Sequence, residues 1–559
     1  MLSSGGLLTG KSGYNIAMTE KDICDQLGVP LSDIPHKERI RDLMAWRNEW
    51  KLYRRKCDST GQDIISAYAP DAPYKVYKNE IWWGDTWDAT DYGRDYDFSR
   101  PFFEQFAELQ KVVPREGTSV FNSENCDFNS HIRTSKNCYL CSLVVECENT
   151  MYSYFLNINK DITDCNYMLG STLCYECNQM ENGYNAIMTE ESTNVSDTFF
   201  CYQLRGCNNC MFSSNLANKS YYLFNKPCTK EELAEAKNKY LNGSYEAWKQ
   251  GLAEYEKIKA ATPRRATTAI NCENCTGDHL FNSRNCEESY EGKESEDVFH
   301  AVSFYQSKSI ASTYSAGWPG CELMYYSAVS RGSMRSKFCY YTFYSSDLTY
   351  CDSSANSDNC FGCIGMRHKK YCILNKQYAK EEYEALVPRI IEHMKSTGEW
   401  GKFFPHALSP FAYNETAAHD FLPLTEEEAT KQGWRWREKE HQEYRPASIP
   451  SLPDNIKDVS DTILKELLAC ESCGDSTGKS PGGKNYKIIP QELAFYKNMS
   501  LPLPHFCPTC RNARRIKSNN PRALFDDTCA NCNTAIQTSY PTGHKEIVYC
   551  EKCFLDAVN

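Results

Sequence analysis

No stretch of the 559-residue chain approaches the ~18 consecutive apolar residues that a membrane-spanning helix needs. The opening residues, MLSSGGLLTGKSGYNIAMTEKD, lack the basic start and apolar core of a secretory signal. The GxSxG, P-loop and HExxH motifs, and a GxGxxG followed by a helix, are missing as well. These absences predict a cytoplasmic protein without a membrane association, and they favour a non-enzymatic role over a catalytic one.

Two residue types are abundant instead, with 30 Cys and 37 Tyr in the chain. The hydrophobic fraction of 41% and charged fraction of 24% are ordinary globular values and exclude wholesale disorder. The net charge of −11 argues against a protein that coats nucleic acid with its whole surface. Without an export signal, so many cysteines predict a reducing compartment, where thiols bind metal or pack in a core instead of forming disulfides.

Four CxxC pairs near the C-terminal end form two quartets. The insert between the pairs is longer in the first quartet, from Cys473 to Cys507, than in the second, from Cys532 to Cys550. Two CxxC pairs brought together give tetrahedral four-thiolate ligation of Zn²⁺, a closed and therefore structural type of site. We predict about two structural zinc ions, and more if CxxC pairs elsewhere also bind metal. The predicted ligands are Cys470, Cys473, Cys507, Cys510, Cys529, Cys532, Cys550 and Cys553.

The central cysteines follow a different rule. Those from Cys126 to Cys228 all carry numbers divisible by three, and longer regular spacings lie beneath this pattern. A period of about 18–21 residues without a helical pattern predicts the coils of a right-handed parallel β-solenoid. The alternative is a string of small zinc modules built on the central CxxC pairs. These pairs are 138/141, 174/177, 207/210, 272/275 and 360/363.

The central region is predicted to contain two copies of one module. FNSENC at Phe121–Cys126 recurs as FNSRNC at Phe281–Cys286. Both copies end in a CxxC, a Lys-x-Tyr, an Asn-Lys and a Lys-Glu-Glu that opens a helix, expected at about 230–260 and 380–396. A helix after each solenoid would cap its open edge. The copies should superpose, with Asn225 and Asn375 at their ends.

These features divide the chain into six predicted segments. Residues 1–117 form an N-terminal domain with a basic amphipathic helix from His36 through Tyr53, interpreted as a docked or nucleic-acid-binding helix, and an aromatic-acidic cap between Trp82 and Phe106. The others are the first solenoid copy with its helix (118–262), the second copy with its helix (263–400), a Pro-rich connector (401–465), zinc module 1 (466–522) and zinc module 2 (523–559).

Several phrases together resemble a known family. They are RNEWKLYRRKCDSTGQDIIS, DYGRDYDFSRPFFEQF, NCFGCIGMRHKKYCILNKQYAKEEYE, SPFAYNET and IIPQELAFYKNMSLPLPHFCPTCRNARR. The chain resembles, over nearly its whole length, the cysteine-rich proteins with zinc-ribbon-like ends that ultra-small bacteria of the candidate phyla radiation encode. This family has no assigned activity, so the resemblance implies a cytoplasmic bacterial zinc protein and no catalytic residues.

Three functions compete. The first is a non-enzymatic zinc-binding protein whose C-terminal modules contact nucleic acid or a ribonucleoprotein, because Arg forks beside a rigid zinc knuckle suit phosphate oxygens. The predicted contacts are Arg511, Arg514, Arg515, Lys517 and Arg522, within a segment from Lys484 to Arg522 that holds eight basic residues against Glu492. The alternative is a protein-protein interaction scaffold built on the solenoid. The third is a carbohydrate-active enzyme, for which clustered acids such as Asp85, Asp88, Asp91, Asp95 and Asp97 are available.

Overall fold

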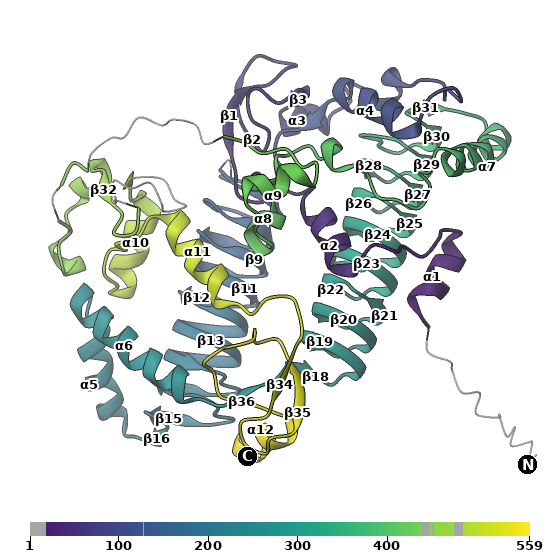
Figure 1. Cartoon of the computed structure of the whole chain (residues 1–559). Helices are drawn as coiled ribbons and strands as arrows, with labels where there is room; N and C mark the ends of the chain where they lie inside the picture. Colours follow the sequence, from purple (N-terminus) through teal and green to yellow (C-terminus); the bar gives the residue numbers. More distant parts are fainter. Residues whose placement is uncertain (1–17, 127, 439–446, 450, 474–484, 559) are drawn as a thin grey trace, which may run out of the picture. The chain divides into compact units, whose positions relative to one another are not determined.

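A computed structural model describes residues 18–126, 128–438, 447–449, 451–473 and 485–558 (Figure 1). It is mainly β, with 34% strand against 26% helix. The chain forms two compact units, each built on one curled parallel sheet. Unit 1 consists of Met1–Leu43, Asp95–Phe102 and Ala269–Phe403, and unit 2 of Met44–Arg94, Phe103–Thr268 and Phe404–Asn559. Parts of the predicted segments at 1–117, 401–465 and 466–522 lie outside the described residues, namely 1–17, 439–446, 450 and 474–484.

The sheet of unit 2 has twelve strands, which pair in parallel except for the final antiparallel pair, β15–β16. Helices α5 (Lys230–Tyr240) and α6 (Tyr245–Ala261) follow it and pack against β13, β14 and β15. The strands are β5 (Val120–Phe121), β6 (Ser130–Arg133), β7 (Ser142–Val145), β8 (Glu148–Met151), β9 (Tyr154–Asn157), β10 (Lys160–Thr163), β11 (Asn166–Leu169), β12 (Thr172–Tyr175), β13 (Asn178–Tyr202), β14 (Asn208–Met211), β15 (Ser220–Leu223) and β16 (Lys226–Pro227).

The sheet of unit 1 has fourteen strands and also ends in an antiparallel pair, β30–β31. Helix α1 (Glu20–Leu27) packs on β23 and β24, and α7 (Lys380–Ser396) packs on β30. The strands are β18 (Ala269–Ile270), β19 (Glu273–Phe281), β20 (Arg284–Lys293), β21 (Glu296–Phe299), β22 (Val302–Tyr305), β23 (Lys308–Gly317), β24 (Glu322–Arg331), β25 (Met334–Lys337), β26 (Tyr340–Phe343), β27 (Ser346–Thr349), β28 (Asp352–Ala355), β29 (Asp358–Phe361), β30 (Lys370–Ile373) and β31 (Lys376–Gln377).

Paired residues lie 12 positions apart in both sheets. Lys160 pairs with Thr172 in unit 2, and Ser346 pairs with Asp358 in unit 1. Unit 1 departs from this step around β19, where Glu273 pairs with Arg284 one position short of it, and between β23 and β24, where Lys308 pairs with Glu322 two positions beyond it. The longer period that the cysteine spacings predicted is therefore wrong. Those spacings are multiples of three and sample only some positions of the 12-residue step.

The backbone turns at every third residue. From His131 to Phe224 every third residue has a φ between +48° and +61°, and only two of these residues are glycine. The left-handed region costs an ordinary L-residue roughly 1–2 kcal/mol, and Asn and Asp tolerate it best. Asn side chains at these turns bond to one another along the sheet: Nδ2 of Asn125 donates to Oδ1 of Asn137 at 3.0 Å, and Asn137 donates likewise to Asn149 at 3.0 Å.

The residue after each turn faces the interior, which explains the cysteines at every third position. Oγ of Ser153 donates to the carbonyl of Met151 at 2.7 Å and accepts from the N–H of Cys165 at 3.1 Å. One step further, Sγ of Cys165 donates to the carbonyl of Thr163 at 3.3 Å and accepts from the N–H of Cys177 at 3.3 Å. Cys and Ser thus satisfy the same backbone groups and are interchangeable at inward positions. Cys228, beyond β16, is only half-buried and falls outside this pattern.

The ends of the two sheets have matching local structure. Leu223 pairs with Lys226 in one sheet and Ile373 with Lys376 in the other, and the same sequence offset relates both members of the two pairs. Asn225 and Asn375 lie in these turns with φ of 58° and 64°. Helices start at Lys230 and Lys380, as expected, but the first one is interrupted after Tyr240 and resumes at Tyr245.

The predicted basic helix is shorter than its hydrophobic pattern suggested. Helix α2 (His36–Met44) ends early, and β1 (Tyr53–Lys56) begins where the helix was expected to continue. The Asn48 side chain organises the intervening turn, because its Nδ2 donates to the carbonyl of Lys51 and its Oδ1 accepts from the Lys51 N–H, both at 2.8 Å. Several basic side chains face inward: Arg47, for example, is buried and lies 2.9 Å from Glu49.

The aromatic-acidic segment forms packed turns. Trp82, at the end of α3 (Asn79–Trp82), is buried, and its ring centroid lies 4.8 Å from that of Trp83. Asp88 caps the short helix η1 (Ala89–Tyr92) by accepting from the Thr90 N–H at 2.8 Å. Asp97 accepts from the Ser99 N–H at 2.8 Å. Asp88 and Asp97 thus stabilise turns of the backbone.

The hydrogen bonds of the inward positions predict how the cysteine core responds to substitution. We expect Cys165→Ser to change the free energy of unfolding by less than about 1 kcal/mol, because serine keeps both bonds. Cys165→Ala should cost about 1–3 kcal/mol, since the buried Cys177 N–H loses its acceptor. Denaturant unfolding under reducing conditions measures both, with the half-buried Cys228→Ala as control. Equal loss in the Ser and Ala variants would contradict the proposed role of the thiol.

Candidate metal centres

The first quartet unites two CxxC pairs that lie on different elements. Cys470 and Cys473 follow β32 (Leu468–Ala469), while Cys507 is the N-cap of α11 (Pro508–Ser518), which contains Cys510. The four sulfur atoms all lie within 4.8 Å of one another, and Sγ of Cys473 is 3.7 Å from Sγ of Cys507. Hydrogen bonds from the thiol and the backbone N–H of Cys507 lower the pKa of the Cys470 thiol. A lowered pKa favours the thiolate that a metal ion binds.

The second quartet repeats this layout. Cys529 and Cys532 lie at the turn between β34 (Phe525–Thr528) and β35 (Ala535–Thr538), and Cys550 and Cys553 lie at the start of α12 (Glu551–Val558). Its sulfur atoms also lie within 4.8 Å of one another. The Cys550 N–H donates to Sγ of Cys529 at 3.2 Å, as the Cys507 N–H does to Cys470 at the same distance. Burial raises the pKa of the Cys529 thiol, but hydrogen bonds from backbone N–H groups, first among them that of Cys550, lower it overall.

Both quartets therefore suit a metal ion, and all eight predicted ligands are brought together as expected. Four thiolates complete a tetrahedral shell without leaving a position for substrate, which is typical of a structural site. Among the described residues, no other set of three or more cysteine sulfur atoms lies within 4.8 Å of one another. The central CxxC thiols bond instead to backbone carbonyls, as Cys138 does to Lys136 and Cys177 does to Tyr175.

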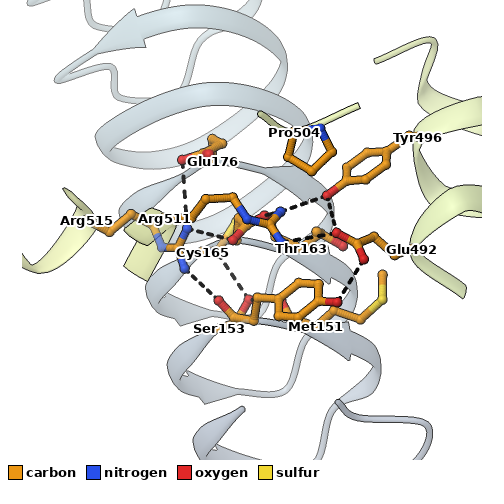
Figure 2. Close-up of polar contacts among 12 residues, drawn as sticks. Met151, Ser153, Thr163, Cys165, Glu176, Glu492, Tyr496, Pro504, Arg511 and Arg515 are labelled. Carbon is orange, nitrogen blue, oxygen red and sulfur yellow. Dashed lines mark hydrogen bonds and ion pairs between the residues drawn. The ribbon is translucent and has the colours of Figure 1, made fainter. Parts of the chain in front are cut away.

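The basic residues beside the first quartet do not form the exposed surface that was predicted. Arg511 and Arg515 on α11 are only 3% and 5% exposed and point toward the curled sheet of unit 2 (Figure 2). Both guanidinium groups form ion pairs with Asp164, which lies at 2.7 Å from Nη1 of Arg515. Arg511 also contacts Glu492 of α10 (Pro490–Met499) at 3.1 Å. The interpretation of Arg511 and Arg515 as nucleic-acid contacts is therefore wrong.

Hydrogen bonds complete this buried network. The Arg511 guanidinium donates to Tyr496 Oη at 2.8 Å, and the Tyr152 hydroxyl donates to the Glu492 carboxylate at 2.8 Å. Arg515 donates to the carbonyl of Tyr152 at 2.7 Å. Burial opposes the charge of Arg511, but Asp164 and its neighbours hold its pKa well above the usual value. Burial and the charge of Asp164 raise the pKa of Glu176, 3.9 Å from Arg515, to about 7.

The other three predicted nucleic-acid contacts differ in their exposure to solvent. Arg514 and Lys517 are exposed on α11. Arg522 is half-buried, with its guanidinium 4.0 Å from the ring centroid of Phe421 and a hydrogen bond to the Tyr167 hydroxyl at 3.2 Å. Lys484, which was counted in the basic segment, lies outside the described residues.

Sequence patterns did not predict two features of the structure. Asp164, the central acid of the network, lies far from Arg511 in the sequence, so no local pattern could connect them; the lone acid Glu492 in a basic segment was the only available signal. A second group, His36, Glu288 and His300, has ligand atoms within 4.8 Å of one another. No local motif joins its members either.

Comparison with known proteins adds no relative, since no family model and no curated protein matches the chain. Among the residues that the structure describes, no helix combines the length and apolar character required to cross a bilayer.

The quartets predict a metal-dependent C-terminal module. We expect Cys529→Ser or Cys550→Ser to release one equivalent of bound metal and to make residues 520–559 protease-sensitive, because ligation energy is folding energy in small metal modules. Cys507→Ser should release the other equivalent. Elemental analysis and limited proteolysis measure both effects, and Cys141→Ser, a buried thiol outside the quartets, should retain full metal content. Unchanged metal and protease resistance in the quartet variants would refute the assignment.

The buried network predicts a large stability difference between neighbouring arginines. Arg511→Ala should destabilise unit 2 by about 3–5 kcal/mol, because it leaves the buried Glu492 without its counter-ion and Asp164 with Arg515 alone. The exposed neighbour Arg514→Ala should stay within about 0.5 kcal/mol of the unchanged protein. Denaturant unfolding measures the stability of both variants, and their bound metal is measured in parallel. Equal free energies of unfolding for the Arg511→Ala and Arg514→Ala variants would show that the network does not hold α11 on the sheet.

Proposed function

We propose that this chain is a non-enzymatic, zinc-binding scaffold protein. The observation that carries the proposal is the buried Arg511–Asp164–Arg515 network, which fastens the helix of a cysteine quartet to the curled sheet (Figure 2). In this arrangement the ions are Zn²⁺, about two per chain, because Cys₄ sets with two-residue spacings are typical of structural zinc. Zinc folds each C-terminal module, and the first module braces the sheet instead of reaching outward.

The scaffold itself is proposed to be two right-handed parallel β-solenoid modules that arose by tandem duplication. The common 12-residue register step and the matching ends, related by a constant sequence offset, support one ancestral module. A right-handed coil agrees with the general preference of crossover connections between parallel strands. The longer step between β23 and β24 in unit 1 is then a local insertion in the second copy.

A protein partner fits this scaffold better than nucleic acid does. Arg511 and Arg515 are engaged in internal ion pairs, which removes two of the five predicted phosphate contacts, and the net charge of −11 disfavours a polyanion. The outer positions of the sheets instead carry exposed apolar side chains, including Ile158, Tyr184, Phe224 and Tyr344. Aromatic residues on a regular, rigid face are suited to protein contacts.

All thirty cysteines are free, which agrees with a reducing compartment such as the cytoplasm.

A binding assay at two salt concentrations tests this choice. The protein should show negligible binding to RNA or DNA at physiological salt, and Arg514→Ala/Lys517→Ala should behave like the unchanged chain. Phosphate contact by the exposed residues would give the opposite result: binding at low salt that falls steeply with added salt and weakens in the double variant across all sequences, with a smaller salt dependence. That outcome would overturn the protein-scaffold proposal in favour of nucleic-acid binding.

A further inference from the structure

Three side chains of unit 1 converge away from the cysteine quartets. His36 is the first residue of α2, Glu288 belongs to β20, and His300 follows β21. One ligand atom of each lies within 4.8 Å of the other two. The two imidazole rings are stacked, with centroids 4.5 Å apart and an interplanar angle of 8°. Segments that are far apart in the sequence therefore bring two imidazoles and a carboxylate together.

The Glu288 carboxylate faces both rings. Its Oε2 lies 2.6 Å from Nε2 of His36 and 3.9 Å from Nδ1 of His300. The second distance is too long for a hydrogen bond, and Nδ1 of His300 is buried without any hydrogen-bond partner. Ligand atoms around a tetrahedral ion with bonds of about 2.0–2.2 Å are ~3.4 Å apart. A small cation would fill the gap between Nδ1 and the carboxylate and would give the buried nitrogen a partner.

The other ring nitrogen of His300 faces a second carboxylate. Its Nε2 faces Oε2 of Glu20 at 3.6 Å, and Glu20 is held in an ion pair by Arg39. The Glu20 and Arg39 side chains are largely shielded from solvent, at 14% and 5% exposure. The negative charge of a nearby carboxylate favours the proton on Nε2, and this leaves the lone pair of Nδ1 available to a metal. Glu20 would therefore orient His300 with Nδ1 toward Glu288.

We propose that His36, Glu288 and His300 form a third metal site, which binds Zn²⁺ or a similar divalent transition ion through two imidazole nitrogens and one carboxylate oxygen. This donor set is harder than that of the cysteine quartets and suits the same class of ion. His36 and Glu288 are 42% and 40% exposed, so solvent reaches the ion and completes its shell. Binding joins the start of α2 to strand β20 and the residue after β21.

Zinc titration of the full-length chain tests this site separately from the quartets. With the cysteine sites filled, Zn²⁺ added against a chromophoric chelator should bind in one further equivalent. His300→Ala and Glu288→Gln should lose this equivalent and keep the quartet zinc. The matched control is His368→Ala, an exposed histidine of the same unit outside the group. Co²⁺ bound in the further equivalent should lack the thiolate charge-transfer bands that the quartets produce.

Two results would overturn the proposal: uptake that stops when the quartets are full, or equal uptake by the unchanged chain and His300→Ala. If His300→Ala loses its fold, judged by circular dichroism and quartet zinc, Glu20→Gln provides the decision. This variant keeps all three proposed ligands and should weaken Zn²⁺ binding at the third site by about 10- to 100-fold. Unchanged affinity in a folded Glu20→Gln protein would contradict the role of Glu20 and the site built on it.

Discussion

A left-handed backbone residue at every third position is the constraint on which both curled sheets depend. Each such residue costs free energy when it is not glycine, and the cost recurs throughout each sheet. Parallel ladders with a 12-residue step offset it, and Asn side chains at the turns add bonds to their counterparts one step away. The same geometry leaves one inward position in three, and most of these positions hold small or medium side chains such as Cys, Ser, Thr, Val, Ile, Leu and Met. The abundance of cysteine and the curled shape of the sheets thus both follow from the left-handed backbone residue at every third position.

This geometry also explains why the module of the first cysteine quartet packs on the sheet of unit 2. Asp164 occupies one of the turn positions and is completely buried, so its carboxylate needs a cationic partner. Helix α11 supplies two, and that helix is anchored at its N-terminal end by Cys507 and Cys510. Loss of the metal would loosen the helix that neutralises Asp164, and loss of the arginines would loosen the helix that carries two ligands. The quartet and the sheet therefore stabilise each other.

The sequence predicted the local chemistry well and the long-range pairing poorly. The CxxC spacings predicted which eight cysteines come together in two quartets, since a knuckle is a local motif. The helix starts at Lys230 and Lys380 followed from local acidic residues. The cysteine spacings did not reveal the 12-residue step, because Ser153, Cys165 and Cys177 occupy equivalent inward positions. Cysteine alone therefore marks only some of the repeated positions. The burial of Arg511 depended on Asp164, which no spacing rule connects to it.

Cysteine occurs in two arrangements in this chain, and the grouping of the sulfur atoms distinguishes them. In the sheets a thiol donates to the carbonyl two residues before it, and burial raises the pKa of Cys147 to about 11 and of Cys201 to about 12. In the quartets four sulfur atoms lie within 4.8 Å of one another, and backbone N–H groups favour the thiolate at Cys470 and Cys529. Some sheet thiols, such as Cys207 and Cys351, also have a lowered pKa, so protonation alone does not separate the two groups. Four converging sulfur atoms are what a tetrahedral ion requires, and among the described cysteines only the two quartets provide them.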